Sequence, residues 1–443
     1  MICLLLSSIF FTHAYAQTGK WGLDECMAYA VENSTKVKTQ DLTNDNYRQS
    51  KNAALASFFP SASAGVGGSA NFGRSIDPET NIYTNVTNFG NSYSVSSSMP
   101  VFSGLANINT YKASKVAVMM GKEELEQIKD QVALETMEAY FQVIYYSKAA
   151  EYAGEQLEAS RTNYTKSLRL EELGMQSRAE VLQLEAQVAS DDYTLTQQEN
   201  NRDMALITLK EKMNYPVEEE LDIDTEVMIE SAVLDNPVHE IISYASSNNP
   251  RVKAAEYSLR QAELNYAASK GYLYPSISLS GNFSTGYAYN PDYVPQNATD
   301  RQTPFMQQLK DKQGYYVGAS LSIPIFDGLY RRANANRQRN NMRIAEQSKI
   351  SVERTLQSEI EQNYRQMQGY GKEYIQATKK VEAATLAHKA VIQKYDQGLI
   401  SAFDLQTSAN RVLESQSQQL NARLQYIIKC RLMEYYKGEP LIR

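Results

Sequence analysis

The chain has 443 residues, with 51 acidic and 44 basic side chains and a net charge of −7, so its charge does not favour a nucleic acid as partner. With three His and no phosphate-binding loop, nucleophile elbow or His/Glu zinc pattern, the sequence predicts no enzyme activity and no cofactor or metal site. No Pro falls between Pro100 and Pro216 or between Pro324 and Pro440, and such long Pro-free tracts are typical of long helices.

The first residues are typical of an export signal. A short apolar run, Ile2 to Phe11, precedes Ala14-Tyr15-Ala16, which matches a cleavage motif, so residues 1–16 are predicted to be a signal peptide. The positive charge that usually opens such a segment is absent, which leaves a buried N-terminal helix as the alternative. After this segment no run of about 18 apolar residues follows, so membrane insertion is predicted only as a closed β-barrel.

Two halves of the chain repeat each other. The segment starting Tyr29-Ala-Val-Glu-Asn is matched 215 positions later by the one starting Tyr244-Ala-Ser-Ser-Asn. Phe59-Pro-Ser is matched by Tyr274-Pro-Ser at the same separation. The start of each half therefore has a counterpart in the other half.

The later part of each half repeats at a slightly larger separation. Pro100-Val-Phe-Ser-Gly-Leu is matched 224 positions later by Pro324-Ile-Phe-Asp-Gly-Leu, and Gly174-Met-Gln-Ser by Gly398-Leu-Ile-Ser. We predict a first structural repeat over residues 17–220 and a second over residues 221–443, with a mixed segment at the start of the second.

Each repeat is expected to begin with a short helix that ends before a Pro, Thr35–Ser57 or Pro250–Tyr272. A strand, a polar loop and a second strand follow. In the second half, Val317, Ala319, Leu321, Ile323 and Ile325 alternate with small residues, and Ile277, Leu279 and Phe283 alternate with Ser and Asn. Period-2 alternation of this kind is typical of a barrel with an apolar outside and a wet lumen.

The strands of the first half are expected near Ser61–Arg74 and Ser92–Val101. The intervening segments, about Ser75–Asn91 and Tyr289–Gln313, are predicted to be loops that face the cell exterior. An aromatic girdle is expected at the loop ends of the strands, from Tyr83, Phe89, Tyr93, Tyr287, Tyr289 and Tyr315. A soluble sandwich with exposed tyrosines is the alternative, although four strands are few for a sandwich.

A very long helix is predicted after the second strand of each repeat. The first runs from Tyr111 to about Glu172, roughly 62 residues or about 93 Å, and the second from about Arg331 to Gln397. Each turns at a Gly and returns as a shorter helix, about Ser177–Asn214 or Ser401–Lys437. Their apolar stripes are thin, which is a coiled-coil pattern and suits a wall one helix thick.

The two predicted turns carry the same capping pattern. Ser177-x-x-Glu180 and Ser401-x-x-Asp404 match capping boxes, in which hydroxyl and carboxylate bind free backbone N–H groups. Gly174 and Gly398 stand where a helix C-cap needs a positive φ. Capping is compatible with docking, because a rigid tip is a better surface for a partner.

These motifs resemble one family. Pro100-Val-Phe-Ser-Gly104 and Pro324-Ile-Phe-Asp-Gly328 are similar to the strand-to-helix junctions of the TolC-like outer-membrane efflux proteins. Leu173–Glu180 and Tyr395–Leu405 are similar to the first and second helical hairpin tips of that family. The resemblance rests on the duplicated order of the motifs and covers nearly the whole chain after the signal.

The resemblance implies a mainly α fold with a membrane β-barrel, built from a duplicated strand–long-helix-hairpin repeat. It implies a homotrimer in which four strands per subunit close one twelve-stranded barrel in the outer membrane, in contact with lipid, while a helical tunnel crosses the periplasm. It also implies a periplasmic adaptor and an inner-membrane transporter as partners, in a tripartite efflux or type I secretion system for which this protein is a passive conduit.

Site residues follow from the same resemblance. The candidate adaptor-docking residues at the tips are Gly174, Met175, Ser177, Gly398, Leu399, Ile400 and Ser401, and the junction residues are Pro100, Gly104, Pro324 and Gly328. Asp404 falls where family members can carry a carboxylate of the periplasmic aperture, so it is a candidate for the aperture as well as for a cap. Thr407 stands where the best-known member carries a second acid, so a two-acid ring is not implied.

Two other functions fit parts of the sequence. A periplasmic adaptor is also rich in helical hairpins, but it should carry one hairpin between lipoyl-like β segments. A coiled-coil scaffold should have neither an export signal nor alternating strands. The two strand–helix repeats favour the channel over both.

Overall fold

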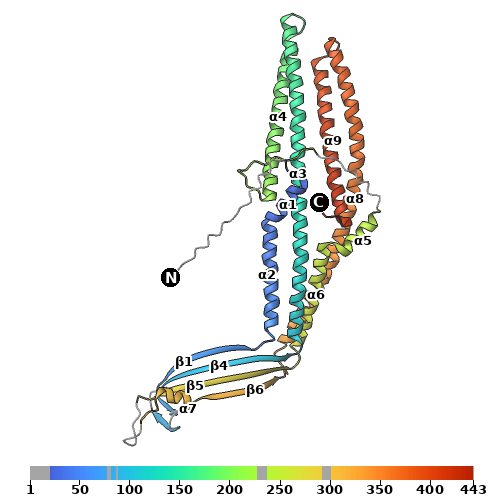
Figure 1. The fold of residues 1–443 in the computed structure, drawn as a ribbon. Coiled ribbons are helices and arrows are strands. Elements are labelled where there is room, and N and C mark those ends of the chain that lie inside the picture. The colour runs from blue at the N-terminus through green and yellow to red at the C-terminus, as the bar shows by residue number, and fades with distance from the viewer. Residues whose placement is uncertain (1–19, 77–80, 86–87, 227–236, 292–300, 443) are drawn as a thin grey trace, which may run out of the picture. The chain divides into compact units, whose positions relative to one another are not determined.

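A computed structural model describes residues 20–76, 81–85, 88–226, 237–291 and 301–442 (Figure 1). The predicted signal peptide, residues 1–16, lies outside the described residues. The chain divides into two compact units, which we describe separately. Unit 1 contains the described residues up to Gln40, those of Leu125–Asn249 and those from Arg354 onwards; unit 2 contains those of Asp41–Glu124 and Pro250–Glu353.

The predicted long helices and their returns are confirmed. Helices α3 (Ala106–Glu172) and α8 (Tyr330–Asp396) contain 67 residues each, and α4 (Arg178–Met213) and α9 (Ala402–Lys437) contain 36 each. The predicted start of α3 at Tyr111 was wrong by five residues, because the helix begins directly after the turn at the end of the preceding strand.

The short helices are also confirmed, and three further helices are present that the sequence patterns did not predict. Helices α2 (Thr35–Ala56) and α6 (Pro250–Gly271) each end one residue before the predicted boundary. The further helices are α1 (Leu23–Asn33), α5 (Val238–Asn248) and α7 (Phe305–Asp311).

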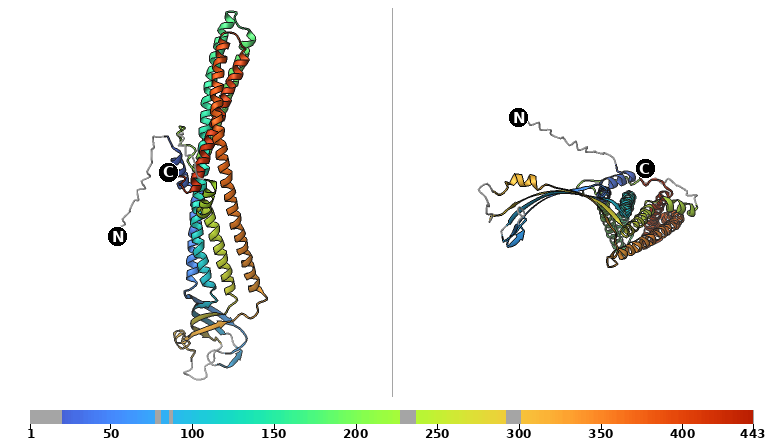
Figure 2. Two further views of the ribbon diagram at one scale, coloured as in Figure 1. Left: turned by 90° about the vertical axis from the view of Figure 1, so that its right-hand side faces the viewer. Right: turned by 90° about the horizontal axis from the view of Figure 1, so that it is seen from below.

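Unit 2 contains one antiparallel sheet in the order β1-β4-β5-β6 (Figure 1). Its strands are β1 (Ser61–Asn71), β4 (Asn88–Ser103), β5 (Ser276–Tyr289) and β6 (Gly314–Ser322). Figure 2 shows the sheet from below as a single curved layer, as expected from strand twist. β6 ends at Ser322, so Ile323 and Ile325 lie beyond the strand that was predicted to contain them.

The segments predicted to be exterior loops contain regular structure. A small hairpin of β2 (Arg74–Ile76) and β3 (Tyr83–Asn85) and the first residues of β4 occupy most of Ser75–Asn91. Helix α7 lies within Tyr289–Gln313 and packs on β5. Short elements of this kind have too few residues for a periodic pattern to reveal them.

Gln308 of α7 takes the place of a strand partner for β5. Its side-chain amide accepts from the Ala288 N–H and donates to the Ala288 carbonyl oxygen, both at 3.0 Å. Gln308 is fully buried and lies opposite the part of β5 that continues beyond the pairing with β6. The amide therefore satisfies backbone groups that the shorter β6 leaves free.

The strand register separates the side chains into two faces, as the period-2 alternation predicted. Ile277 lies opposite Leu321, and Met99 opposite Leu279, on one face. The other face is lined by Ser and Gly, and its cross-strand serines bond to each other: Ser63 Oγ to Ser96 Oγ at 2.8 Å, and Ser278 Oγ to Ser320 Oγ at 2.8 Å. The sheet thus has one apolar face and one small polar face.

Aromatic residues gather on the apolar face of the sheet. Phe89 is paired with Tyr289 in the register, and the rings of Phe283 and Tyr315 lie 5.1 Å apart. The Tyr287 ring lies 5.1 Å from Phe305 of α7. The structure therefore brings together several of the aromatic residues that the sequence singled out.

Unit 1 has the larger apolar core, and α1, α3, α4 and α9 contribute to it. Its fully buried side chains include Met27, Met137, Ile144, Leu209 and Met213. The Tyr140 hydroxyl donates to the Asp224 carbonyl oxygen at 2.6 Å, beside a parallel bridge between Trp21 and Ile223. This core ties the start of the chain and the segment after α4 to the long helix.

Across the described residues, no helix combines the length and the hydropathy that a membrane crossing requires.

Candidate functional site

The first hairpin tip, in unit 1, is a fully bonded turn. Gly174 has φ +73°, its N–H donates to the Glu171 carbonyl at 2.8 Å, and the Met175 N–H donates to the Leu170 carbonyl at 2.8 Å. These two bonds and the left-handed residue define a Schellman motif, which satisfies carbonyl groups at the end of α3. The predicted C-cap at Gly174 is confirmed.

The second tip, also in unit 1, repeats this geometry. Gly398 has φ +72°, and its N–H donates to the Tyr395 carbonyl at 2.9 Å. The Leu399 N–H donates to the Lys394 carbonyl at 3.0 Å. Gly174 and Gly398 therefore occupy equivalent positions in structure as well as in sequence.

Both return helices begin with the predicted capping boxes. Ser177 Oγ accepts from the Glu180 N–H at 3.3 Å, and Ser401 Oγ accepts from the Asp404 N–H at 3.3 Å. In return, the Ser177 N–H donates to Glu180 Oε2 at 3.4 Å and the Ser401 N–H to Asp404 Oδ2 at 3.2 Å. Each tip is thus fixed on both sides of its turn.

Exposed apolar side chains stand between the two caps of each tip. Met175 is 74% exposed and Leu399 is 68% exposed, whereas Ile400 is partly buried and presents less apolar surface than expected. Fixed, exposed apolar groups are what a partner helix can cover.

Asp404 is exposed at the start of α9, and the interactions that fix it are those of the cap. Its Oδ2 accepts from the Ser401 N–H at 3.2 Å and from the Ser401 hydroxyl at 2.8 Å. Glu180 occupies the same position in the first tip and makes the same pair of contacts with Ser177.

The two hairpins lie side by side within unit 1 (Figures 1 and 2). Lys166 Nζ forms an ion pair with Asp396 Oδ1 at 2.6 Å, and the Gln176 amide donates to the Tyr395 hydroxyl at 3.2 Å. The sequence patterns did not predict these contacts, because they join side chains 219 or more positions apart. Since Lys166 and Asp396 are both about half exposed, the pair contributes about 0–1 kcal/mol.

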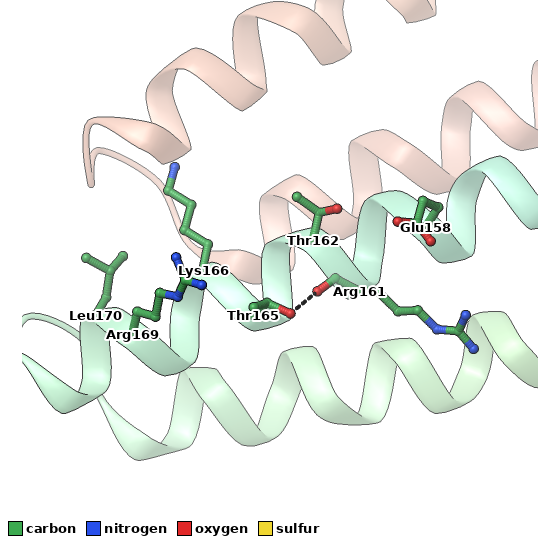
Figure 3. Close-up of a pocket in the computed structure, with 7 residues that line it drawn as sticks. All are labelled: Glu158, Arg161, Thr162, Thr165, Lys166, Arg169 and Leu170. Atoms are coloured by element: carbon green, nitrogen blue, oxygen red, sulfur yellow. Dashed lines mark hydrogen bonds between the residues drawn. The ribbon is translucent and has the colours of Figure 1, made fainter.

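A groove of about 470 Å³ runs along α3 beside the first tip (Figure 3). Its charged lining is mainly basic, from Arg161, Lys166 and Arg169. In Figure 3 Lys166 points toward the second hairpin, where Asp396 lies, and Arg161 points toward α4, where its guanidinium pairs with Asp192 at 3.2 Å.

The strand–helix junctions, in unit 2, share an unusual backbone. Gly104 and Leu105 have φ +60° and +67°, and Gly328 and Leu329 have φ +67° and +69°. A Leu in this region is strained, so the junction geometry is imposed by the structure around it.

The two junctions differ in their surroundings. A Cβ on Gly104 would lie 2.0 Å from the Gly271 carbonyl oxygen, so glycine is required there by close packing of α6. A Cβ on Gly328 would meet no described atom within 4 Å. Likewise Pro100 lies inside β4 and beside a bulge, whereas Pro324 follows the end of β6.

The two cysteines of the described chain are free and buried. Burial, helped by the nearby Glu25 charge, raises the pKa of the Cys26 thiol to about 12, and burial also raises the pKa of Cys430. Both therefore remain protonated thiols at neutral pH. Within the described residues, no group of His, Cys, Asp and Glu is arranged to hold a metal ion.

Comparison with known protein families gives a match over residues 241–431, to the outer membrane efflux protein family. The matched residues span most of the second predicted repeat, from α5 to α9. This match agrees with the outer-membrane location that the sequence analysis predicted.

Two curated proteins are similar to part of this chain. The solvent efflux pump outer membrane protein SrpC and the toluene efflux pump outer membrane protein TtgI, both of Pseudomonas putida, are 25% identical over 188 residues, 41% of this chain. The chain matches about a third, 35%, of the length of these relatives.

Solved structures of outer-membrane channels share the fold. VceC of Vibrio cholerae has a TM-score of 0.78 at 12% identity, over 95% of this chain and 96% of its own. The CmeC channel of Campylobacter jejuni has a TM-score of 0.79 at 15% identity, over 95% and 87%. The chain therefore shares its mainly helical fold with few strands with these channels.

The tip geometry predicts opposite effects for two Gly-to-Ala changes on the second hairpin. Gly398→Ala should lower the stability by about 1–2 kcal/mol, because its left-handed φ disfavours a Cβ. Gly369→Ala, inside α8, should raise it by about 1 kcal/mol, since Ala favours a helix interior. In both positions a Cβ has open space, so contacts do not obscure the comparison. Thermal unfolding monitored by circular dichroism measures both, and equal shifts would contradict the assigned turn.

Proposed function

We propose that the protein is the outer-membrane channel of a tripartite efflux or secretion system. In this role three copies form a passive conduit from periplasm to exterior that docks a periplasmic adaptor and an inner-membrane transporter. The observation that carries the proposal is the four-stranded sheet, with one apolar face, one face of Ser and Gly, and two edges that no described strand covers, in a chain of which residues 241–431 match this family.

The sheet supports a trimeric barrel for a physical reason. Strand edges carry backbone groups that need partners, and lipid offers none. Four strands are too few to close around a lumen, whereas three copies supply twelve. The apolar face would meet lipid and the Ser-lined face would enclose water.

The duplication explains how one chain builds two neighbouring parts of the wall. We propose that residues 17–220 form one structural repeat and residues 221–443 the second, after removal of signal peptide 1–16. Support comes from the matched helix lengths, 67 residues for α3 and α8 and 36 for α4 and α9.

The docking site for the adaptor is proposed at the two tips. Gly174 and Gly398 set the turns, and Ser177 and Ser401 fix the returning helices. Met175 and Leu399, with the partly buried Ile400, present apolar surface. The junction residues Pro100, Gly104, Pro324 and Gly328 have a different role, which is to turn the chain from sheet to helix.

The assembly is tested directly. The protein should fractionate with the outer membrane, have the mass of three chains in mild detergent, and conduct ions in planar bilayers. A single-chain mass with intact conductance would contradict the trimer, and inner-membrane attachment would favour the adaptor alternative.

A charged tip should disrupt docking. Met175→Asp and Leu399→Asp place a carboxylate where a partner would bury apolar surface, so each should weaken binding of the adaptor that co-purifies from native membranes at least tenfold. Leu386→Asp is the matched control, because Leu386 of α8 is also 68% exposed but lies away from the tip. Binding by surface plasmon resonance, with trimer mass checked for each variant, measures the effect; equal losses in all three would reject the tips as the site.

Asp404 is a candidate for a carboxylate of the periplasmic aperture, and capping of α9 is the competing role, which we favour. If three copies line the mouth, Asp404→Ala should reduce cation selectivity in planar bilayers. If Asp404 only caps, Asp404→Ala and Glu180→Ala should each cost about 1 kcal/mol and leave selectivity unchanged. We expect the second result, since the hydrogen bonds that the Asp404 carboxylate accepts from Ser401 are those of the cap. Selective loss of cation preference in Asp404→Ala would establish the aperture.

A further inference from the structure

We propose that β6 of one copy pairs with β1 of the next copy in one defined register, in which Leu321 lies opposite the Val66 of its neighbour. The proposal rests on the trimeric channel and goes beyond it, because it names the residues that meet at the seam between copies. It is derived from the internal repeat and from the strand pairs within one chain.

The strand pairing agrees with the two sequence separations of the repeat, 215 positions for its first part and 224 for its later part. In the first repeat Ser61 of β1 lies opposite Ser98 of β4. Moving Ser61 by 215 positions and Ser98 by 224 positions gives Ser276 and Ser322, which lie opposite each other in β5 and β6. β5 is therefore the structural counterpart of β1, and β6 the counterpart of β4.

The pairing between the repeats can then be transferred to the pairing between copies. Within the chain, Ser97 of β4 lies opposite Gly281 of β5. The counterpart of Ser97 is Leu321, 224 positions later, and the counterpart of Gly281 is Val66, 215 positions earlier. The seam from β6 to β1 therefore places Leu321 opposite Val66.

Side-chain chemistry agrees with this register. It puts two exposed apolar residues, Leu321 and Val66, together on the apolar face. One position along, Ser322 would lie opposite Gly65, on the face where Ser and Gly already pair within the chain. A shift by one residue would place apolar side chains on the Ser-lined face, which strand geometry disfavours.

The exposed residues after β6 indicate where β1 of another copy would pair. Val101 and Phe102 belong to β4 and are 54% and 40% exposed beside β5. Their counterparts Ile325 and Phe326 follow β6 and are 94% and 81% exposed. We expect β6 to extend through these residues once β1 of another copy lies beside it.

The glycine junctions point to the same neighbour. The Gly104 carbonyl and the backbone of Gly271 are in close contact within the chain. The counterparts are Gly328, which has open space around it among the described residues, and Ala56. Ala56 of the neighbouring copy would approach Gly328, so the seam completes a contact that already exists once in each chain.

Disulfide cross-linking tests the register. The background is the full chain with Cys26→Ala and Cys430→Ala, carrying Leu321→Cys with Val66→Cys. A disulfide needs Cα atoms about 4.4–6.8 Å apart, which directly opposite residues satisfy and diagonal ones, at about 7–8 Å, do not. After mild oxidation of membranes, non-reducing electrophoresis should therefore show a covalent trimer.

Three comparisons make the outcome decisive. Leu321→Cys paired with Ala64→Cys or with Gly68→Cys should give little covalent oligomer, since each pair is two residues out of register. Ser97→Cys with Gly281→Cys should cross-link within one chain and leave the mass of a monomer, because this pair is already opposite.

The experiment distinguishes a wrong strand register from a wrong proposal that the protein is a trimeric channel. A covalent trimer with Ala64→Cys or Gly68→Cys instead of Val66→Cys would overturn the register while the trimer stands. No cross-link in any seam pair, with a trimer mass in detergent and a positive intrachain control, would overturn the pairing of β6 with β1. A monomer mass in detergent would overturn the proposed channel itself.

Discussion

The unpaired edges of the four-stranded sheet, at β1 and β6, are the main constraint on how this chain can be stable in a membrane. β1 and β6 each present backbone groups along one side that no described strand pairs, on a sheet whose apolar face also carries exposed side chains such as Val66, Val317 and Leu321. A single copy cannot satisfy these groups in lipid. The repeat supplies a means, because the contact between β4 and β5 is a template for a contact between copies. In the proposed trimer, folding and assembly are therefore linked through the contact between β6 of one copy and β1 of the next.

Much of this fold could be predicted from the sequence, for identifiable reasons. The Pro-free tracts set the long helices, and the glycines at 174 and 398 fixed their ends to within a residue or two. Period-2 alternation located β5 and β6 and assigned their faces. The start of α3 was missed because nothing in the local pattern marks how soon after Leu105 a helix can begin.

The candidate site at the hairpin tips could be predicted only in part from the sequence. Both caps of each tip are local, so Ser177 with Glu180 and Ser401 with Asp404 are visible as spaced pairs. The contact between Gln176 and Tyr395 depends on how two hairpins pack, and no spacing within either hairpin reveals it. Gln308 is a similar case, since its role depends on β6 being shorter than β5.

The equal lengths of the paired helices restrict how such a protein can evolve. Each added residue advances a helix by about 1.5 Å and turns it by about 100°. An insertion in α3 alone would leave the tips of one copy at two heights and turn its packing stripe away from α4. Viable length changes should therefore arise as matched insertions in both halves, on both arms of each hairpin. They should come in steps of about seven residues, two turns, which restore the stripe. Relatives from cell envelopes of different width would then have hairpin helices that differ in length by multiples of about seven residues.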